Sequence, residues 1–218
     1  MLLLVDLDNT LVNRASAFNI WTIDFVRTLG RPDSEAAWLI EADRDGYEPR
    51  DSLARAIKER FRLTTAVEDL VDRLLYEHVD SMTMEDGTKK ALTYAKEHGW
   101  KIAIVTNGTT TQQTLKIQRV GLAPYVDAVV ISEAERVKKP DLKIFQIAAQ
   151  RLNVELTGGW MVGDHPTADI AGGQAAGLKT GWVSRGMEWP EEARFPTLMA
   201  ATAAEVMDNV VRRSPLTS

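Results

Sequence analysis

The first residues in the chain that suggest chemistry are two acidic side chains directly after an apolar run. Leu2 to Val5 is followed by Asp6-Leu7-Asp8-Asn9-Thr10. Along an extended chain Asp6 and Asp8 point to the same side, about 6 to 7 Å apart, so both carboxylates can reach one ligand. In an open parallel sheet, ligands bind beyond the carboxyl ends of the strands. The alternative is that Asp and Asn only end a strand and begin a turn, as they often do.

Three further segments, two at the ends of apolar runs and one before an expected helix, carry polar side chains of a complementary kind. Thr106 and Asn107, followed by a glycine, offer hydroxyl, amide and backbone donors to an anion. Lys139 precedes a proline that suits the first turn of a helix. Asp164 and Asp169 stand in a Gly-Asp-x-x-x-x-Asp segment. Taken singly, each has a structural alternative: an ordinary turn, a solvated lysine, or a carboxylate in the first turn of a helix.

A cluster of these carboxylates needs a cation. Two unit charges about 4 Å apart repel by about 4 kcal/mol at an effective dielectric near 20, so gathering Asp6, Asp8 and Asp164 is costly. The chain has no Cys and three His, which leaves an all-oxygen donor set. Such a set selects a hard divalent ion, and Mg²⁺ is favoured because it accepts a few carboxylates completed by water and substrate oxygen.

The elements that must position these residues follow from the apolar pattern. Runs of strand length occur at residues 2–5, 102–105, 126–131, 160–162 and 180–183, and they are apolar throughout rather than alternating. Such runs suit strands covered on both faces. Stretches of helical period lie between the later runs, for example Leu142, Phe145, Ala148, Ala149 and Leu152. The alternation predicts an α/β fold: a Rossmann-like parallel sheet with helices on both faces.

The interval from Asn13 to Ser81 breaks this alternation. It contains no convincing strand and about four helical segments, the clearest with an apolar stripe at Val67, Leu70, Val71, Leu74 and Leu75. We therefore predict two domains: a Rossmann-like core from residues 1–12 and 82–218, and a helical domain from residues 13–81. The tail from Arg212 to Ser218 is expected to fray.

Composition excludes several classes of function. With 44% hydrophobic and 26% charged residues the chain can build a substantial core. Its net charge of −5 argues against a nucleic acid polymer as partner. The lack of Cys removes disulfides and thiolate chemistry and fits a reducing compartment. No stretch approaches the roughly 18 apolar residues of a membrane span, and the run at 2–5 is too short for a signal core. We expect a cytoplasmic protein with no membrane partner.

The order of the motifs resembles the haloacid dehalogenase superfamily. Its members share an Asp-x-Asp-x-Thr strand end, a Thr or Ser strand end, a Lys before Pro, and Gly-Asp-x-x-x-x-Asp, and all four occur here in that order. The helical insertion matches the position and kind of the family's α-helical (C1-type) cap. The resemblance implies a Mg²⁺ site formed by the Asp6 carboxylate, the backbone carbonyl of Asp8, and Asp164, with Asp169 steadying Lys139 or metal-bound water.

The resemblance also implies a mechanism. Asp6 would attack the phosphorus of a monoester to form an aspartyl-phosphate. Asp8 would protonate the leaving alkoxide and then remove a proton from the attacking water. Thr106, the Asn107 backbone N–H and Lys139 would bind the phosphoryl oxygens together with the metal.

Alternatives on the same scaffold stay open. A phosphatase is favoured over a 2-haloacid dehalogenase because dehalogenating members lack a carboxylate at the position of Asp8, but a phosphomutase and a non-catalytic binding module remain. Residues 105–152 look most like the nucleoside monophosphate and sugar acid phosphatases. The expected partner is a small-molecule phosphate ester, and the expected assembly is a monomer or homodimer.

Several other residues have two interpretations. In the segment from Asp43 to Arg50, Tyr47 offers a stacking face and Arg50 a forked donor for substrate, but the segment is also typical of a solvated loop. His165 occupies a position where the family usually carries Ser or Thr. It is either a helix-entry residue or a substrate contact with pH sensitivity. His78 and His98 are expected at the surface.

Overall fold

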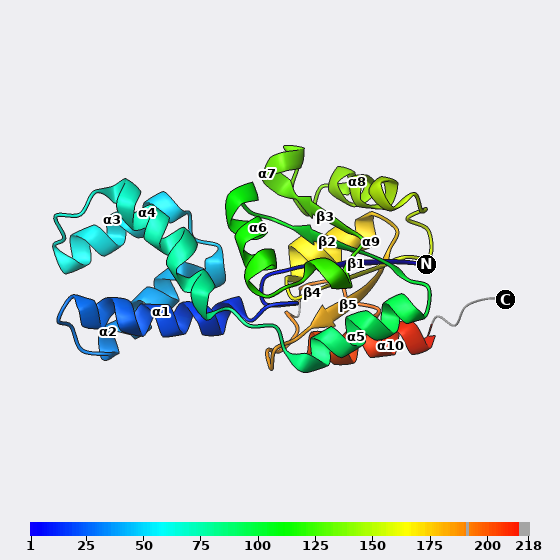
Figure 1. The fold of residues 1–218 in the computed structure, drawn as a ribbon, viewed down its shortest axis with the longest axis horizontal. Helices are drawn as coiled ribbons and strands as arrows, with labels where there is room; N and C mark the ends of the chain where they lie inside the picture. Colours follow the sequence, from blue (N-terminus) through cyan, green and yellow to red (C-terminus); the bar gives the residue numbers. More distant parts are fainter. Residues whose placement is uncertain (191, 214–218) are drawn as a thin grey trace. The chain divides into compact units, whose positions relative to one another are not determined.

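The computed structural model describes residues 1–190 and 192–213, and these residues form a six-stranded sheet. Figure 1 shows the strands with helices around them. All strand pairs of the sheet are parallel, in the order β3-β2-β1-β4-β5-β6. The strands are β1 (Leu2–Val5), β2 (Lys101–Thr106), β3 (Ala128–Ile131), β4 (Trp160–Gly163), β5 (Lys179–Val183) and β6 (Leu198–Ala200). The predicted α/β class is confirmed. The short edge strand β6 is an addition that no apolar run predicts.

Strand β1 lies in the middle of the sheet and sets the register of its neighbours. Leu3 pairs with Ile102 of β2 and with Trp160 of β4. All four residues of β1 are buried, as an uninterrupted apolar strand covered on both faces requires. The Asp6 N–H donates to the Val162 carbonyl at 2.9 Å, which ties the end of β1 to β4. The carboxyl ends of β1, β2 and β4 therefore meet at one edge.

Helices cover both faces of this sheet. Figure 1 places α8 on one side and the packed pair α5 and α10 on the other; α8 contacts β2 and β3, and α10 contacts β4 and β5. None of the helices in the described ranges combines the length and apolar character needed to cross a bilayer. The helices around the sheet are α5 (Asp86–Glu97), α6 (Thr110–Arg119), η3 (Ala123–Tyr125), α7 (Ser132–Glu135), α8 (Leu142–Leu152), η4 (Pro166–Ala171), α9 (Gly172–Ala175) and α10 (Ala203–Arg213).

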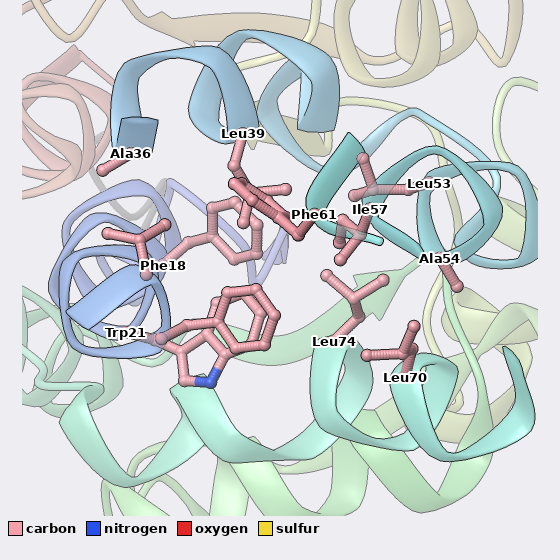
Figure 2. Close-up of a cluster of buried hydrophobic side chains, with 12 residues drawn as sticks. Phe18, Trp21, Ala36, Leu39, Leu53, Ala54, Ile57, Phe61, Leu70 and Leu74 are labelled. Carbon is pink, nitrogen blue, oxygen red and sulfur yellow. The ribbon is translucent and has the colours of Figure 1, made fainter. Parts of the chain in front are cut away.

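The chain forms two compact units: residues 1–12 with the chain from Met84 onward, and Asn13–Thr83. We call them the core unit and the helical unit. The helical unit has its own hydrophobic core, in which Phe18, Trp21 and Phe61 pack with Leu70 and Leu74 (Figure 2). Its elements are α1 (Arg14–Thr28), α2 (Ser34–Asp43), η1 (Arg44–Gly46), α3 (Arg50–Phe61), α4 (Val67–Tyr76) and η2 (Glu77–Ser81).

The surroundings of His78 and the end of α10 differ from what the sequence predicts. His78 is 1% exposed, so the surface position expected for it is wrong. The reason is that η2 packs on α1, which brings the His78 ring to 5.8 Å from the Phe18 ring. Helix α10 continues to Arg213, and residues 214–218 of the expected frayed tail lie outside the described residues.

Candidate active site

The centre of the site is a buried lysine between two buried carboxylates. Lys139 Nζ donates to Asp6 Oδ1 at 2.5 Å and to Asp169 Oδ1 at 2.7 Å. Asp6 is the first residue after β1, Lys139 precedes α8, and Asp169 lies in η4, so three distant segments meet here. Burying a charge is tolerated when it is paired and hydrogen-bonded, and this ammonium has two such partners.

Three carboxylates converge beside this lysine. One oxygen each from Asp6, Asp164 and Asp169 lies within 4.8 Å of the others. The second oxygen of Asp169 accepts from the His165 N–H at 3.0 Å. Gly163 makes room for this side chain, because a Cβ there would lie 2.3 Å from Asp169 Cγ. A compact set of carboxylate oxygens suits a hard divalent cation.

Burial and charge crowding act on the Asp6 carboxyl. Burial raises the pKa of Asp6 to about 7; Lys139 lowers it, and the nearby Asp169 and Asp8 raise it. Burial would lower the pKa of Lys139, but Asp169 and Asp6 outweigh it and hold that pKa above its ordinary value. The lysine therefore stays cationic, and the repulsion left among the carboxylates is the part that a bound cation would relieve.

Asp164 has a further cationic neighbour that the sequence does not predict. Arg185 Nη1 donates to Asp164 Oδ2 at 3.1 Å, and the Trp182 indole N–H donates to the Asp164 carbonyl at 2.6 Å. Arg185 lies just after the carboxyl end of β5, the same kind of position that identifies the other site residues. Arg185 could therefore have been predicted from its place after an apolar run of strand length.

The end of β2 contributes Thr106 and Asn107. Thr106 is buried, and its Oγ1 accepts from Gln113 Nε2 at 2.6 Å. The Asn107 side chain holds the backbone of Lys139 at two points: Nδ2 donates to the Lys139 carbonyl at 3.0 Å, and Oδ1 accepts from the Lys139 N–H at 2.9 Å. The Asn107 side chain thus fixes the segment that carries Lys139. This contact is separate from the phosphate-binding role that the resemblance implies for the Asn107 backbone N–H.

The Asp8 side chain is directed to α6 rather than to the three converging carboxylates. Lys116 Nζ lies 2.8 and 2.7 Å from its two oxygens, and Gln113 Nε2 lies 3.0 Å from Oδ2. Lys116 is not among the residues that the sequence predicts. The metal role that the resemblance implies for Asp8 uses its backbone carbonyl, which these side-chain contacts leave untouched.

His165 serves as the entry residue of η4. Its Nδ1 accepts from the backbone N–H groups of Thr167 and Ala168, both at 3.0 Å. A ring nitrogen that accepts two hydrogen bonds carries no proton, and it satisfies N–H groups that a helix start leaves unpaired. Of the two interpretations, these contacts favour helix entry.

The two substrate-contact candidates in the helical unit, Tyr47 and Arg50, differ in their surroundings. Tyr47 is 55% exposed. Arg50 donates to Asp43 Oδ1 at 2.7 Å and to the Glu48 carbonyl at 2.9 Å, so its guanidinium is held within the unit. Arg14, which the sequence does not single out, binds the same Asp43 carboxylate through both terminal nitrogens, with Nη2 at 2.9 Å from Oδ1.

Known proteins resemble this chain in sequence and in fold. The model of the haloacid dehalogenase-like hydrolases matches residues 3–183, and the chain belongs to this family. The magnesium-bound structure of YfnB from Bacillus subtilis superposes with a TM-score of 0.78, covering 96% of this chain and 97% of that one at 23% identity. At that identity the likeness shows the fold alone.

Two relatives of known activity match about half of the chain. Ribulose-1,5-bisphosphate 5-phosphatase of Halopiger xanaduensis is 41% identical over 103 residues, which are 47% of this chain and 43% of that protein. Pyrimidine 5'-nucleotidase YjjG of Escherichia coli is 38% identical over 107 residues, 49% of this chain and 48% of that protein. The chain thus matches about half the length of these curated relatives.

Proposed function

We propose that the protein is a Mg²⁺-dependent phosphatase that hydrolyses small-molecule phosphate monoesters through an aspartyl-phosphate on Asp6. The observation that carries the proposal is the buried contact of Asp6 with Lys139, beside two further carboxylates and with Asp8 two residues away. The presence of Asp8 supports ester hydrolysis over halide displacement, because an alkoxide needs a proton to leave and a halide does not. The named activities of the two relatives support the same reaction class.

The donor set suits the metal. Asp6 and Asp164 would hold Mg²⁺ with their carboxylates, and Asp8 with its backbone carbonyl, as the resemblance implies. When bound, the ion offsets the negative charge on the phosphoryl oxygens and on the attacking carboxylate. Asp169 contacts Lys139 directly and would hold that ammonium in place.

The chain's own groups account for the first half of the reaction. A carboxylate oxygen of Asp6 forms a bond to phosphorus while the bond from phosphorus to the ester oxygen breaks, and the ester oxygen takes the proton of the Asp8 carboxyl group. Lys139, the Thr106 hydroxyl and the Asn107 backbone N–H stabilise the charge on the oxygens of the transferring group.

In the second half the roles of Asp8 reverse. Its carboxylate removes a proton from a water molecule as that water attacks phosphorus, and the bond from phosphorus to Asp6 breaks. Inorganic phosphate leaves, the Asp6 carboxylate is restored, and Asp8 is protonated again. One ester and one water are thus converted into an alcohol and phosphate.

Nucleoside monophosphates and sugar phosphates are the proposed substrates. The relatives act on a sugar bisphosphate and on pyrimidine nucleotides, which supports this class. The helical unit would act as the cap that selects the leaving group, and the exposed Tyr47 is its best candidate contact. Arg50, engaged by Asp43, would contribute only by exchanging that partner.

The test is release of nitrophenolate from p-nitrophenyl phosphate, followed by a panel of nucleotides, sugar phosphates and phosphoglycolate. We expect turnover that requires Mg²⁺, stops with a chelator and is lost in Asp6→Asn. Asp72→Asn, which changes an exposed carboxylate of α4, is the matched control. Turnover unaffected by the chelator and by Asp6→Asn would overturn the proposal. An isomeric sugar phosphate as product would indicate a mutase instead.

A further inference from the structure

Helix α6 buries two polar side chains that the proposed mechanism does not use. Gln113 and Lys116 are three residues apart and so lie on one face of the helix, together with the buried Ile117. A buried lysine is costly unless an anion faces it. The buried ammonium of Lys116 therefore requires an anionic partner, and this partner is a residue of the candidate active site.

That partner is Asp8. Lys116 Nζ reaches both of its oxygens, at 2.8 and 2.7 Å, across 108 positions of the chain. Gln113 uses one amide nitrogen for two acceptors, Asp8 Oδ2 at 3.0 Å and Thr106 Oγ1 at 2.6 Å. One face of α6 thus restrains a carboxylate from β1's end and a hydroxyl from β2's end.

Asp8 and Lys116 differ in how far solvent can reach them. The Asp8 side chain is 25% exposed, whereas that of Lys116 is 3% exposed. Asp8 can therefore be reached from solvent while the ammonium lies behind it. Lys116 can therefore act on a reaction through Asp8.

We propose that Lys116, supported by Gln113, is a positioning residue for Asp8. The inference rests on the proposed phosphatase reaction. Contact with both oxygens, at 2.8 and 2.7 Å, restricts rotation of the Asp8 carboxyl group. Lys116 exchanges no proton, so the bonds made and broken remain those given above.

Substrates whose leaving groups differ in basicity distinguish a positioning role of Lys116 from a purely structural role. Nitrophenolate leaves without a proton, whereas the alkoxide of a sugar phosphate needs one. The experiment compares kcat/KM, which reports steps up to the first irreversible one, for p-nitrophenyl phosphate and for the best sugar phosphate of the panel. We expect Lys116→Met to lower kcat/KM for the sugar phosphate by about 10²-fold, the scale of general acid catalysis, and that for p-nitrophenyl phosphate far less.

A burst experiment gives a second readout. With p-nitrophenyl phosphate, Lys116→Met is expected to release one nitrophenolate per enzyme quickly and then turn over slowly, because hydrolysis of the aspartyl-phosphate still needs Asp8 as base. Lys116→Arg keeps the charge and its donors and is expected to restore most of the wild-type behaviour in both assays.

Lys143→Met removes an exposed lysine from α8 and should leave both esters unaffected. Thermal melting checks that Lys116→Met is folded. If it is not, Lys116→Gln is used in its place. An equal loss of kcat/KM for both esters would overturn the positioning role and leave the phosphatase proposal intact. No turnover of either ester by the wild-type protein would overturn the phosphatase proposal itself.

Discussion

The core unit and the helical unit each contain a cluster of largely buried charged side chains, and the net charges of the two clusters have opposite signs. The helical unit places one carboxylate, Asp43, against the guanidinium groups of Arg14 and Arg50. The core unit brings four carboxylates against three cations within the described ranges: Asp6, Asp8, Asp164 and Asp169 with Lys116, Lys139 and Arg185.

The geometry of the clusters differs as much as their charge. Arg14 binds Asp43 through both terminal nitrogens, and Arg50 adds a third contact, so the carboxylate is closed in. Burial would raise the pKa of Asp43, but the two arginines outweigh it and hold that pKa below its ordinary value. In the core unit, burial raises the pKa of Asp6 despite Lys139. We therefore expect the cluster around Asp43 to serve stability and the core cluster, with its surplus negative charge, to bind a cation.

The sharpest test of this contrast is Asp6→Asn, which should affect activity and spare the fold. We expect kcat to fall by at least about 10³-fold, as when other enzymes lose their nucleophile. The free energy of unfolding should change by less than about 1 kcal/mol, because relief of repulsion offsets the loss of charge opposite Lys139. Steady-state kinetics and urea unfolding measure the two effects. A loss of several kcal/mol in stability would show that the core cluster is structural.

Asp43→Asn should behave in the opposite way. It leaves two arginines without a counter-charge, and breaking a buried pair in this manner costs about 3 kcal/mol. The folded fraction should still turn over p-nitrophenyl phosphate far better than Asp6→Asn does. Urea unfolding followed by circular dichroism measures the loss, with the exposed Asp72→Asn as control. Stability equal to that of the control would contradict the contrast.

Metal binding should stabilise the protein through the core cluster alone. By linkage, Mg²⁺ at about 100 times its Kd adds about 2.7 kcal/mol to the free energy of unfolding. We expect the melting temperature to rise with Mg²⁺ in the wild-type protein and in Asp43→Asn, and to stay constant in Asp164→Asn. A chelator should reverse the rise. An undiminished rise in Asp164→Asn would place the cation elsewhere.

Gln113→Leu should cost activity rather than stability. Its amide donates to Asp8 and Thr106, while its Oε1 is buried with no hydrogen-bond partner among the described residues. Removing an unsatisfied group offsets part of the lost hydrogen bonding, so the melting temperature should change little. We expect kcat/KM to fall by about 10-fold, the equivalent of one hydrogen bond. Gln118→Leu, on the exposed face of the same helix, should have no effect.

The smallest expected effect is a pH dependence of the helical unit. The pKa of folded Asp43 lies below its ordinary value of 3.8, so its contribution to stability is present above that pH and is lost as the pH falls through the folded value. The stability difference between wild type and Asp43→Asn should therefore be constant near neutral pH and shrink below about pH 4. Urea unfolding at several pH values gives this difference, and a constant difference down to pH 3 would contradict the assignment.

The sequence by itself predicted which strand ends bring polar side chains to one edge of the sheet. Asp6, Thr106 and Asp164 each follow an uninterrupted apolar run, and the carboxyl ends of parallel strands must meet at one edge, so their meeting follows from pattern alone. Lys139 was identified by its place before a proline and a helix. The same reasoning predicted five strands. It omitted β6, whose three residues have no buried apolar run and become a strand by pairing with β5.

The tertiary structure decided which charges face one another. That Lys116 meets Asp8, Arg185 meets Asp164, and Arg14 meets Asp43 depends on how each element is rotated and placed in its unit. A helical period places residues on a common face, but it does not say what that face packs against. His78 was misplaced for the same reason, since only the packing of η2 on α1 buries it. Local spacing predicts which residues form an element, whereas the pairing of side chains from different elements, here 21 to 108 positions apart, is decided by packing.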